Sequence, residues 1–338
     1  MTDGTQLPYG ESDSAVSFTP AWWLPSGHAQ TLWRRFAGAP VVTQQRERLE
    51  LLDGDFIDLD WVWQGANSPG RDETIVLILH GLCGCSSSPY ITSLQAQLQA
   101  YGLTSVAMNF RGCSGEINRL ARAYHSGISD DVQEVMSRLV QAYPDCRFTA
   151  VGYSLGGNVL LKWLGEQGEQ APVERAVAVS TPFDLAQCSL AMGRGPSRLY
   201  GRYFVRRLVN DMRGKRVHLE QHDAREQAGI LAGLGDPDGI RSIWEFDDRF
   251  TAPLHGFADA ADYYARSSSS RFLPEIRKDT LLIQSADDPL IPDAALPAAG
   301  SLPGNVQLLL SRAGGHVGFI AGAGSNWLER RIADFITR

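Results

Sequence analysis

A Gly-x-Ser-x-Gly turn between an expected strand and an expected helix constrains the fold of this chain more than any other feature. The turn is Gly152-Tyr153-Ser154-Leu155-Gly156. It follows the short apolar run 147–151, and leucines and a tryptophan follow it at helical spacing from Asn158. Glycine suits positions 152 and 156, because side chains there would collide with the neighbouring strand or helix. This context indicates a serine raised at a strand end; the alternative is a glycine-rich turn with an inert serine.

Strand-like and helix-like segments alternate on both sides of this turn. Further strands are expected at 74–80, 104–110, 175–180, 280–284 and 306–310, and helices at 91–98, 129–142 and 326–336. The sequence therefore predicts an α/β fold with a mostly parallel central sheet and helices on both faces. Runs 46–52 and 56–63, joined by Asp53-Gly54-Asp55, predict an N-terminal β-hairpin. Ser129 or Asp130 is expected to cap the helix that begins there.

The alternation stops between about residues 182 and 270. This stretch is polar, rich in arginine and helical where it is regular. We therefore expect a lead and packing segment at 1–40 and one α/β domain at 41–338, with a helical cap inserted at about 182–270. The basic, aromatic run 198–207 is amphipathic, which is typical of a cap helix with a solvated charged face. Contact with a lipid or with an acidic substrate group is the alternative.

Composition excludes several classes of protein. The 338 residues are 43% hydrophobic with a net charge of −7 and interspersed signs, which does not favour a nucleic-acid partner. No apolar run approaches the roughly 20 residues that span a bilayer, and the polar N-terminus does not resemble a signal peptide. The five cysteines lack zinc-site spacing, which favours reduced thiols in a cytoplasmic protein. We expect a monomer with no metal and no organic cofactor.

The order of the polar residues along the chain predicts serine chemistry. A serine hydroxyl needs a base to take its proton, usually an imidazole oriented by a carboxylate, and the chain order in this arrangement is Ser, acid, His. His316 alone of the seven histidines lies beyond the late strands. The acid is Asp287 or Asp288, and Asp288 is favoured because Pro292 follows it at an offset common after such acids.

An oxyanion hole requires two backbone N–H groups that point at the developing negative charge. Leu155, directly after Ser154, is expected to supply one, and Leu82, in the loop after strand 74–80, the other. His80 is interpreted as a structural residue that orders this loop. Arg111 and Cys113 lie at the C-terminal end of an expected strand, where α/β sites gather, and His125 is a candidate to line the pocket. Packing roles are expected for all three.

Several blocks together resemble one family, the YheT-like α/β-hydrolases. The blocks are Trp22-Trp23-Leu24-Pro25-Ser26-Gly27-His28, His80-Gly81-Leu82 through Ser88-Pro89-Tyr90, Phe110-Arg111-Gly112-Cys113-Ser114-Gly115, Tyr124-His125-Ser126-Gly127, Gly152 through Asn158, Phe246-Asp247-Asp248, His255-Gly256-Phe257, Asp287-Asp288-Pro289 and Gly315-His316-Val317-Gly318-Phe319. The family includes bacterial esterases and eukaryotic relatives that act on medium-chain acyl esters and phospholipids. The resemblance implies an α/β-hydrolase fold, with Ser154, Asp288 and His316 as the charge-relay residues.

These observations lead to a functional prediction. We expect a serine hydrolase that cleaves carboxylic esters, either short- to medium-chain acyl esters or acylglycerols, through an acyl-enzyme on Ser154. Three alternatives stay open: acyl transfer by the same residues, a non-catalytic binding protein on the same fold, and a thiol enzyme that uses Cys113. The expected partner is a small-molecule ester, and peripheral lipid contact through the cap is the alternative noted above. The cap sequence does not indicate which ester is bound.

Overall fold

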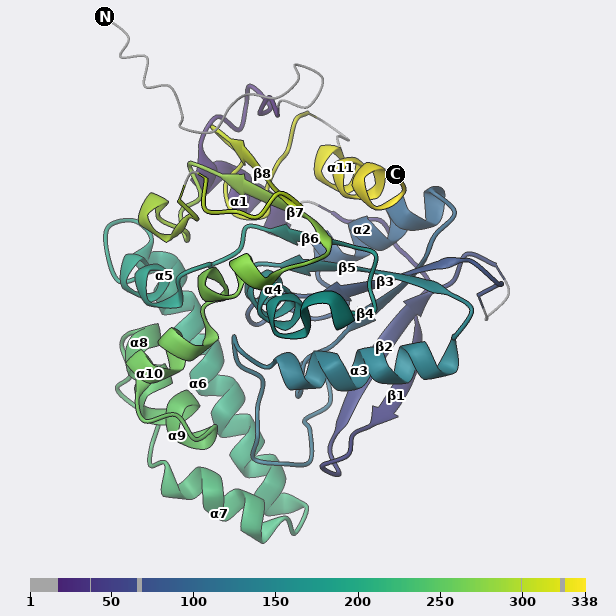
Figure 1. Cartoon of the computed structure of the whole chain (residues 1–338). Helices are drawn as coiled ribbons and strands as arrows, with labels where there is room; N and C mark the ends of the chain where they lie inside the picture. The colour runs from purple at the N-terminus through teal and green to yellow at the C-terminus, as the bar shows by residue number, and fades with distance from the viewer. Residues whose placement is uncertain (1–17, 37, 66–68, 299, 323–325) are drawn as a thin grey trace, which may run out of the picture.

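An eight-stranded sheet organises the described part of the chain. The computed structural model describes residues 18–36, 38–65, 69–298, 300–322 and 326–338, and the expectations for residues 1–17 lie outside this range. The strands are β1 Gln45–Glu50, β2 Phe56–Val62, β3 Thr74–Leu79, β4 Thr104–Met108, β5 Arg147–Tyr153, β6 Arg175–Val179, β7 Asp279–Ser285 and β8 Val306–Ser311. Their spatial order is β1-β2-β4-β3-β5-β6-β7-β8 (Figure 1). Strands β3 to β8 are parallel, and the antiparallel hairpin β1–β2 joins them at β4.

Helices cover both faces of the sheet because its strands are apolar on both sides. In β3, Ile75, Leu77 and Leu79 pack on one face, together with helices α3 and α4. Val76 and Ile78 point to the other face, where α2 and α11 pack. These helices span α2 Pro89–Ala100, α3 Ser129–Ala142, α4 Leu155–Gln167 and α11 Trp327–Ile336. The predicted fold class is confirmed, including the hairpin and the parallel core.

A group of helices interrupts the alternation between β6 and β7. The α-helices are α5 Leu185–Ala191, α6 Arg198–Gln221, α7 Arg225–Gly233, α8 Ile243–Phe246, α9 Ala252–Leu254 and α10 Ala260–Ser267. In the same stretch a π-helical turn spans Asp247–Thr251, and 3₁₀ turns span Ser269–Arg271 and Leu273–Glu275. Two further 3₁₀ turns lie outside it, Gly168–Gln170 before β6 and Asp293–Ala295 after β7. We call residues 185–267 the helical insertion; it lies beside the sheet in Figure 1. The domain boundaries expected at 40/41, 182 and 270 stay predictions.

Two local features differ from the sequence-based expectations. Residue Ile128, rather than Ser129 or Asp130, precedes α3, and no side chain caps this helix. The Ser129 hydroxyl instead accepts a hydrogen bond from Lys162 Nζ at 2.7 Å, so the predicted cap is wrong. A further helix, α1 Gly27–Phe36, forms inside the segment expected only to pack on the domain. Among the described residues, no helix has the length and apolar character needed to cross a bilayer.

Candidate active site

Ser154 sits in a strained turn between β5 and α4. Its φ of 52° and ψ of −120° are unusual for a residue with a side chain, and such strain is typical of functional sites. A Cβ at Gly152 would lie 2.5 Å from the carbonyl oxygen of Gly156, and one at Gly156 would lie 2.5 Å from that of His80. Both contacts are far too close for any side chain. Glycine at these two positions is therefore what allows the turn to form.

The structure brings together the three residues that the sequence pattern singles out. His316 Nε2 lies 2.9 Å from Ser154 Oγ, and His316 Nδ1 lies 2.8 Å from Asp288 Oδ2. The other carboxylate oxygen of Asp288 accepts hydrogen bonds from the N–H groups of Leu290 at 2.8 Å and Ile291 at 3.3 Å. A carboxylate that accepts from Nδ1–H leaves Nε2 free to accept a proton from the serine. The arrangement is therefore able to move a proton from the hydroxyl to the imidazole.

The neighbouring carboxylate faces the other way. Asp287 Oδ1 accepts hydrogen bonds from the N–H of Gly315, at 2.9 Å, and from the Ser285 hydroxyl. It thus holds the backbone next to His316, while Asp288 contacts the imidazole itself. The two residues lie in and just after a turn that follows β7, in which the N–H of Asp288 donates to the carbonyl of Ser285 at 3.3 Å, so the alternation of an extended strand does not account for their different directions.

Helix α1 supports the histidine loop through contacts that sequence reasoning missed. Thr31 Oγ1 accepts a hydrogen bond from the N–H of His316 at 2.8 Å. Gln30, which is fully buried, donates to the carbonyl groups of Leu24 and Ile320 and accepts from the N–H of Ile320 at 2.7 Å. The sole signal in the sequence is the tryptophan-rich block before α1, which does not indicate these contacts.

The loop that carries Leu82 is fixed on both sides of this residue. The N–H of Gly81 donates to the Tyr90 hydroxyl, and the N–H of Cys83 donates to the Tyr124 hydroxyl, both at 2.9 Å. Leu82 and Leu155 border the same cavity as Ser154. The N–H of Leu155 lies in the first turn of α4, where the helix dipole favours an anion.

His80 is buried and orders the start of this loop. Its Nε2 accepts a hydrogen bond from the N–H of Phe110 at 3.1 Å, so Nδ1 carries the proton and donates to the carbonyl of Gly81 at 2.8 Å. Burial lowers the pKa of His80 to about 4. The imidazole is therefore neutral near pH 7, in keeping with a structural role.

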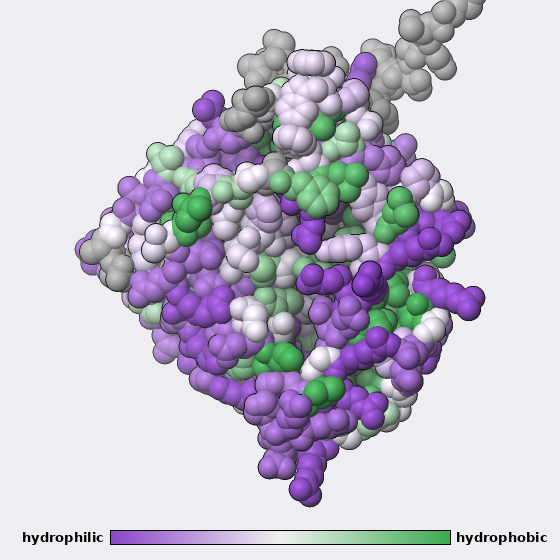
Figure 2. All heavy atoms as spheres, turned by 180° about the vertical axis from the view of Figure 1, so that it is seen from behind, coloured by the Kyte–Doolittle hydropathy of each residue, from purple (hydrophilic) through white to green (hydrophobic). Residues whose placement is uncertain are grey.

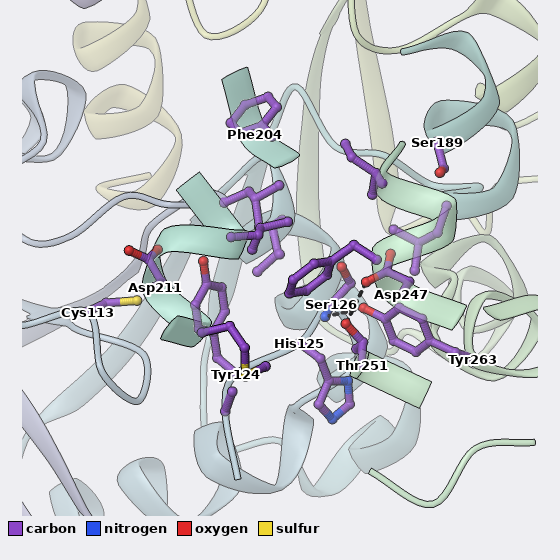
Figure 3. Close-up of a pocket in the computed structure, with 18 of the residues that line it drawn as sticks. Cys113, Tyr124, His125, Ser126, Ser189, Phe204, Asp211, Asp247, Thr251 and Tyr263 are labelled. Atoms are coloured by element: carbon purple, nitrogen blue, oxygen red, sulfur yellow. Dashed lines mark hydrogen bonds between the residues drawn. The ribbon is translucent and has the colours of Figure 1, made fainter. Parts of the chain in front are cut away.

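A cavity of about 300 Å³ opens in front of Ser154 and His316. One side is apolar and comes mainly from the helical insertion and the loop after Asp288: Leu185, Met192, Phe204, Leu208, Ile243, Phe246, Leu290 and Ile291. Figure 3 shows a second, more polar wall with Asp247, Thr251 and Tyr263. Asp247 accepts hydrogen bonds from the hydroxyls of Thr251 and Tyr264, each at 2.6 Å, and its burial raises its pKa to about 6.

The other polar candidates from the sequence have partners or are uncharged. Arg111 is buried and forms ion pairs with Asp53, Asp55 and Asp131. Cys113 borders the cavity, but burial raises the pKa of its thiol well above the ordinary value. A thiol that keeps its proton is a poor nucleophile. Within the described residues, no group of three or more His, Cys, Asp or Glu side chains forms a metal site.

Comparison with known proteins relates the whole chain to ester hydrolases. The family described as "alpha/beta hydrolase fold" matches residues 74–323. The chain is 39% identical to "Putative esterase YheT" of Escherichia coli (strain K12), over 100% of this chain and 98% of that protein. It is 30% identical to "Phospholipase ABHD3" of Homo sapiens, over 95% of this chain and 78% of that protein. The esterase Pf2001 of Pyrococcus furiosus has a similar fold, with a TM-score of 0.56 at 16% identity over 90% of this chain and 98% of the other.

Proposed function

Because this chain belongs to the YheT-like α/β-hydrolases and is an ester hydrolase, we propose that it cleaves short- to medium-chain acyl esters or acylglycerols through an acyl-enzyme on Ser154. The observation that carries the proposal is the hydrogen-bonded series from Ser154 through His316 to Asp288 at the base of an apolar cavity. A serine, an imidazole and a carboxylate in this order suit nucleophilic attack on an ester carbonyl, followed by hydrolysis of the acyl-enzyme.

The proposed reaction begins when His316 Nε2 takes the proton of the Ser154 hydroxyl as its oxygen attacks the ester carbonyl. The N–H groups of Leu82 and Leu155 then donate to the negatively charged oxygen of the tetrahedral intermediate. The imidazolium, stabilised by Asp288, gives its proton to the departing alcohol. Water attacks the acyl-enzyme by the same route, which releases the carboxylic acid and restores the serine.

The volume of the cavity limits the length of the acyl chain that fits in it. A volume of about 300 Å³ lies at the small end of the range for ligand sites, and its apolar wall suits an alkyl chain. Phe204 and Leu208 of α6 are part of this wall. We infer that acyl groups of short to medium length are cleaved faster than long ones.

Replacement of the nucleophile tests the proposal. In Ser154→Ala, hydrolysis of p-nitrophenyl acyl esters is expected to fall by about 10⁴-fold or more, and labelling by a fluorophosphonate probe is expected to disappear. A series of acyl chain lengths on the native enzyme measures the specificity. If Ser154→Ala keeps full activity, the proposal is wrong. If the folded native protein neither hydrolyses esters nor reacts with the probe, the chain is a binding protein on the same fold.

Transfer to an alcohol instead of water stays an alternative for the second half of the reaction. Product analysis with ethanol present separates the two outcomes, since transfer yields an ethyl ester.

We propose further that the enzyme acts as a cytoplasmic monomer. The free state of Cys83, Cys85, Cys113, Cys146 and Cys188 supports a reducing compartment, and size-exclusion chromatography with light scattering measures the oligomeric state.

A further inference from the structure

Helix α1 turns its polar residues inward and its apolar residues toward the solvent. Gln30 and Thr31 form hydrogen bonds with backbone groups of the loop that carries His316, and Arg34 pairs with the buried Glu329. The outward side carries three large apolar residues, with exposed fractions of 47%, 44% and 80%: Leu32, Trp33 and Phe36. Trp22, just before the helix, is 89% exposed. Water-exposed apolar side chains gathered on one helix face are typical of an interaction surface.

The first half of α6 continues this surface. His28 Nδ1 lies 3.0 Å from the Tyr200 hydroxyl, and Arg35 donates to the Tyr203 hydroxyl at 2.7 Å, so the two helices lie side by side. The exposed residues of this half of α6 are Arg198, Leu199, Arg202, Tyr203, Arg206 and Arg207, and Leu199 is 68% exposed. We call these residues, together with Trp22, Leu32, Trp33, Arg35 and Phe36, the α1–α6 face. Figure 2, which views the molecule from behind, shows hydrophobic and strongly hydrophilic residues adjoining on its surface.

The charge of the α1–α6 face is opposite to that of the whole chain. The chain has a net charge of −7, yet residues 27–36 and 198–210 contain no Asp or Glu. Five arginines of the face form no ion pair within the described part of the chain: Arg35, Arg198, Arg202, Arg206 and Arg207. Exposed tryptophan and tyrosine among arginines suit the headgroup region of a bilayer, and the positive charge suits anionic lipid.

The same two helices border the candidate active site on their opposite sides. The inward side of α6 contributes Phe204, Leu208 and Asp211 to the cavity in front of Ser154. The inward side of α1 holds His316 through Thr31. A partner bound to the α1–α6 face would therefore lie one helix away from the cavity.

We propose that the α1–α6 face docks this enzyme on a bilayer surface that contains anionic phospholipid. Trp22 and Phe36 enter the headgroup boundary, and Arg202 and Arg206 lie against the lipid phosphates. The delivery of an ester from the bilayer to the cavity rests on the proposed function, whereas docking does not require catalysis.

Vesicle co-sedimentation of the full chain tests the docking. The native protein and Ser154→Ala are expected to bind equally to vesicles of equal parts phosphatidylcholine and phosphatidylglycerol, and to bind phosphatidylcholine alone at least about tenfold more weakly. Two double variants are expected to partition onto the mixed vesicles at least about tenfold more weakly than the native protein. One is Arg202→Glu with Arg206→Glu, and the other is Trp22→Ser with Phe36→Ser. Both double variants keep native hydrolysis of a soluble short-chain ester, because these side chains lie outside the cavity.

Helix α7 provides the matched controls. Arg225 and Ile230 are exposed there, away from the α1–α6 face, so Arg225→Glu and Ile230→Ser are expected to bind vesicles like the native protein. The proposal is wrong if the control and test variants lose vesicle binding equally, or if the native protein binds neutral and anionic vesicles equally well. If the native protein hydrolyses soluble esters but does not bind vesicles, the docking proposal is wrong and the proposed function is unaffected. The native protein could instead self-associate and fail to bind vesicles. If the Trp22→Ser, Phe36→Ser variant abolishes that self-association, the α1–α6 face binds a second copy of the chain and the proposal is wrong.

Discussion

Asp287 and Asp288 have different roles near His316, because Asp288 contacts the imidazole ring and Asp287 contacts the backbone. Asp288 lies against His316 Nδ1, and Asp287 accepts from the N–H of Gly315. In Asp288→Asn the amide keeps its size, but an NH₂ group that faces Nδ1 favours the wrong imidazole tautomer. We expect kcat to fall by about 10⁴-fold for this variant. In Asp287→Asn an oxygen still accepts from Gly315, and kcat is expected to change by less than about tenfold.

Steady-state kinetics on a soluble ester measure both variants, and circular dichroism checks that each is folded. Equal losses of kcat in the two variants would contradict the separate roles. A larger loss in Asp287→Asn would instead make Asp287 the orienting acid. At this scale the sequence limited the acid to two neighbours, because chain order is a local property. The choice between them depends on the direction of each side chain, which the sequence indicated only through the position of Pro292.

Helix α1 is the element whose role was hardest to predict. Helix prediction depends on an apolar stripe that faces the core, but here Leu32, Trp33 and Phe36 face outward. The buried side is polar, with Gln30 and Thr31 bonded to backbone groups far away in the sequence. By contrast, the runs that form β3 and β5 are apolar on both faces, and their periodicity was sufficient to predict them.

Loss of the Gln30 hydrogen bonds is expected to loosen this element. Gln30→Met has a similar shape but leaves the buried carbonyl of Leu24 and the N–H of Ile320 without this partner, whereas the carbonyl of Ile320 still accepts from the N–H of Ala21 at 2.9 Å. Each buried group left unpaired costs about 1–3 kcal/mol, so the free energy of unfolding is expected to fall by about 3 kcal/mol. Urea denaturation measures the change. Gln221→Met, on the exposed end of α6, is the control and is expected to stay within about 0.5 kcal/mol of native; an equally small change in Gln30→Met would contradict the anchoring role.

At the scale of the whole molecule, the sequence predicted the parallel core and the presence of a helical insertion, but not how the helices of the insertion pack. The core strands bury residues against sequence-local helices, so their pattern is visible in short windows. The insertion distributes its apolar residues among several small clusters, such as Val205 with Phe246 and Phe250. It also turns Phe204 and Leu208 toward an open cavity instead of a packed core. A residue that faces a cavity has the same hydrophobicity as one that faces a core, and the sequence does not distinguish them.

The buried histidines give the whole molecule a defined dependence of stability on pH. Burial lowers the pKa of His80 and of His255 to about 4, and that of His125 well below its ordinary value. Between pH 6.5 and 4 the unfolded chain therefore binds protons on these residues that the folded chain does not, and the free energy of unfolding falls as the pH falls. Each such histidine contributes a slope of up to about 1.4 kcal/mol per pH unit. Asp247, whose pKa is raised to about 6, has the opposite sign because the folded chain holds its proton between pH 6 and 3.8.

Urea denaturation at several values between pH 5 and 6.5 measures the net slope. It is expected to be positive with rising pH, because three histidines oppose Asp247 and the smaller contributions of Asp131 and Asp211, whose pKa values burial also raises. His255→Gln removes one titrating group from the pair that His255 forms with His125, whose ring centroid lies 4.4 Å away. The slope of this variant is expected to be smaller than that of the native protein by up to about 1.4 kcal/mol per pH unit. Asp247→Asn is expected to steepen the slope, since the opposing group is lost. Identical slopes in all three proteins would show that these groups titrate alike in the folded and unfolded chains, and would contradict their burial as neutral species.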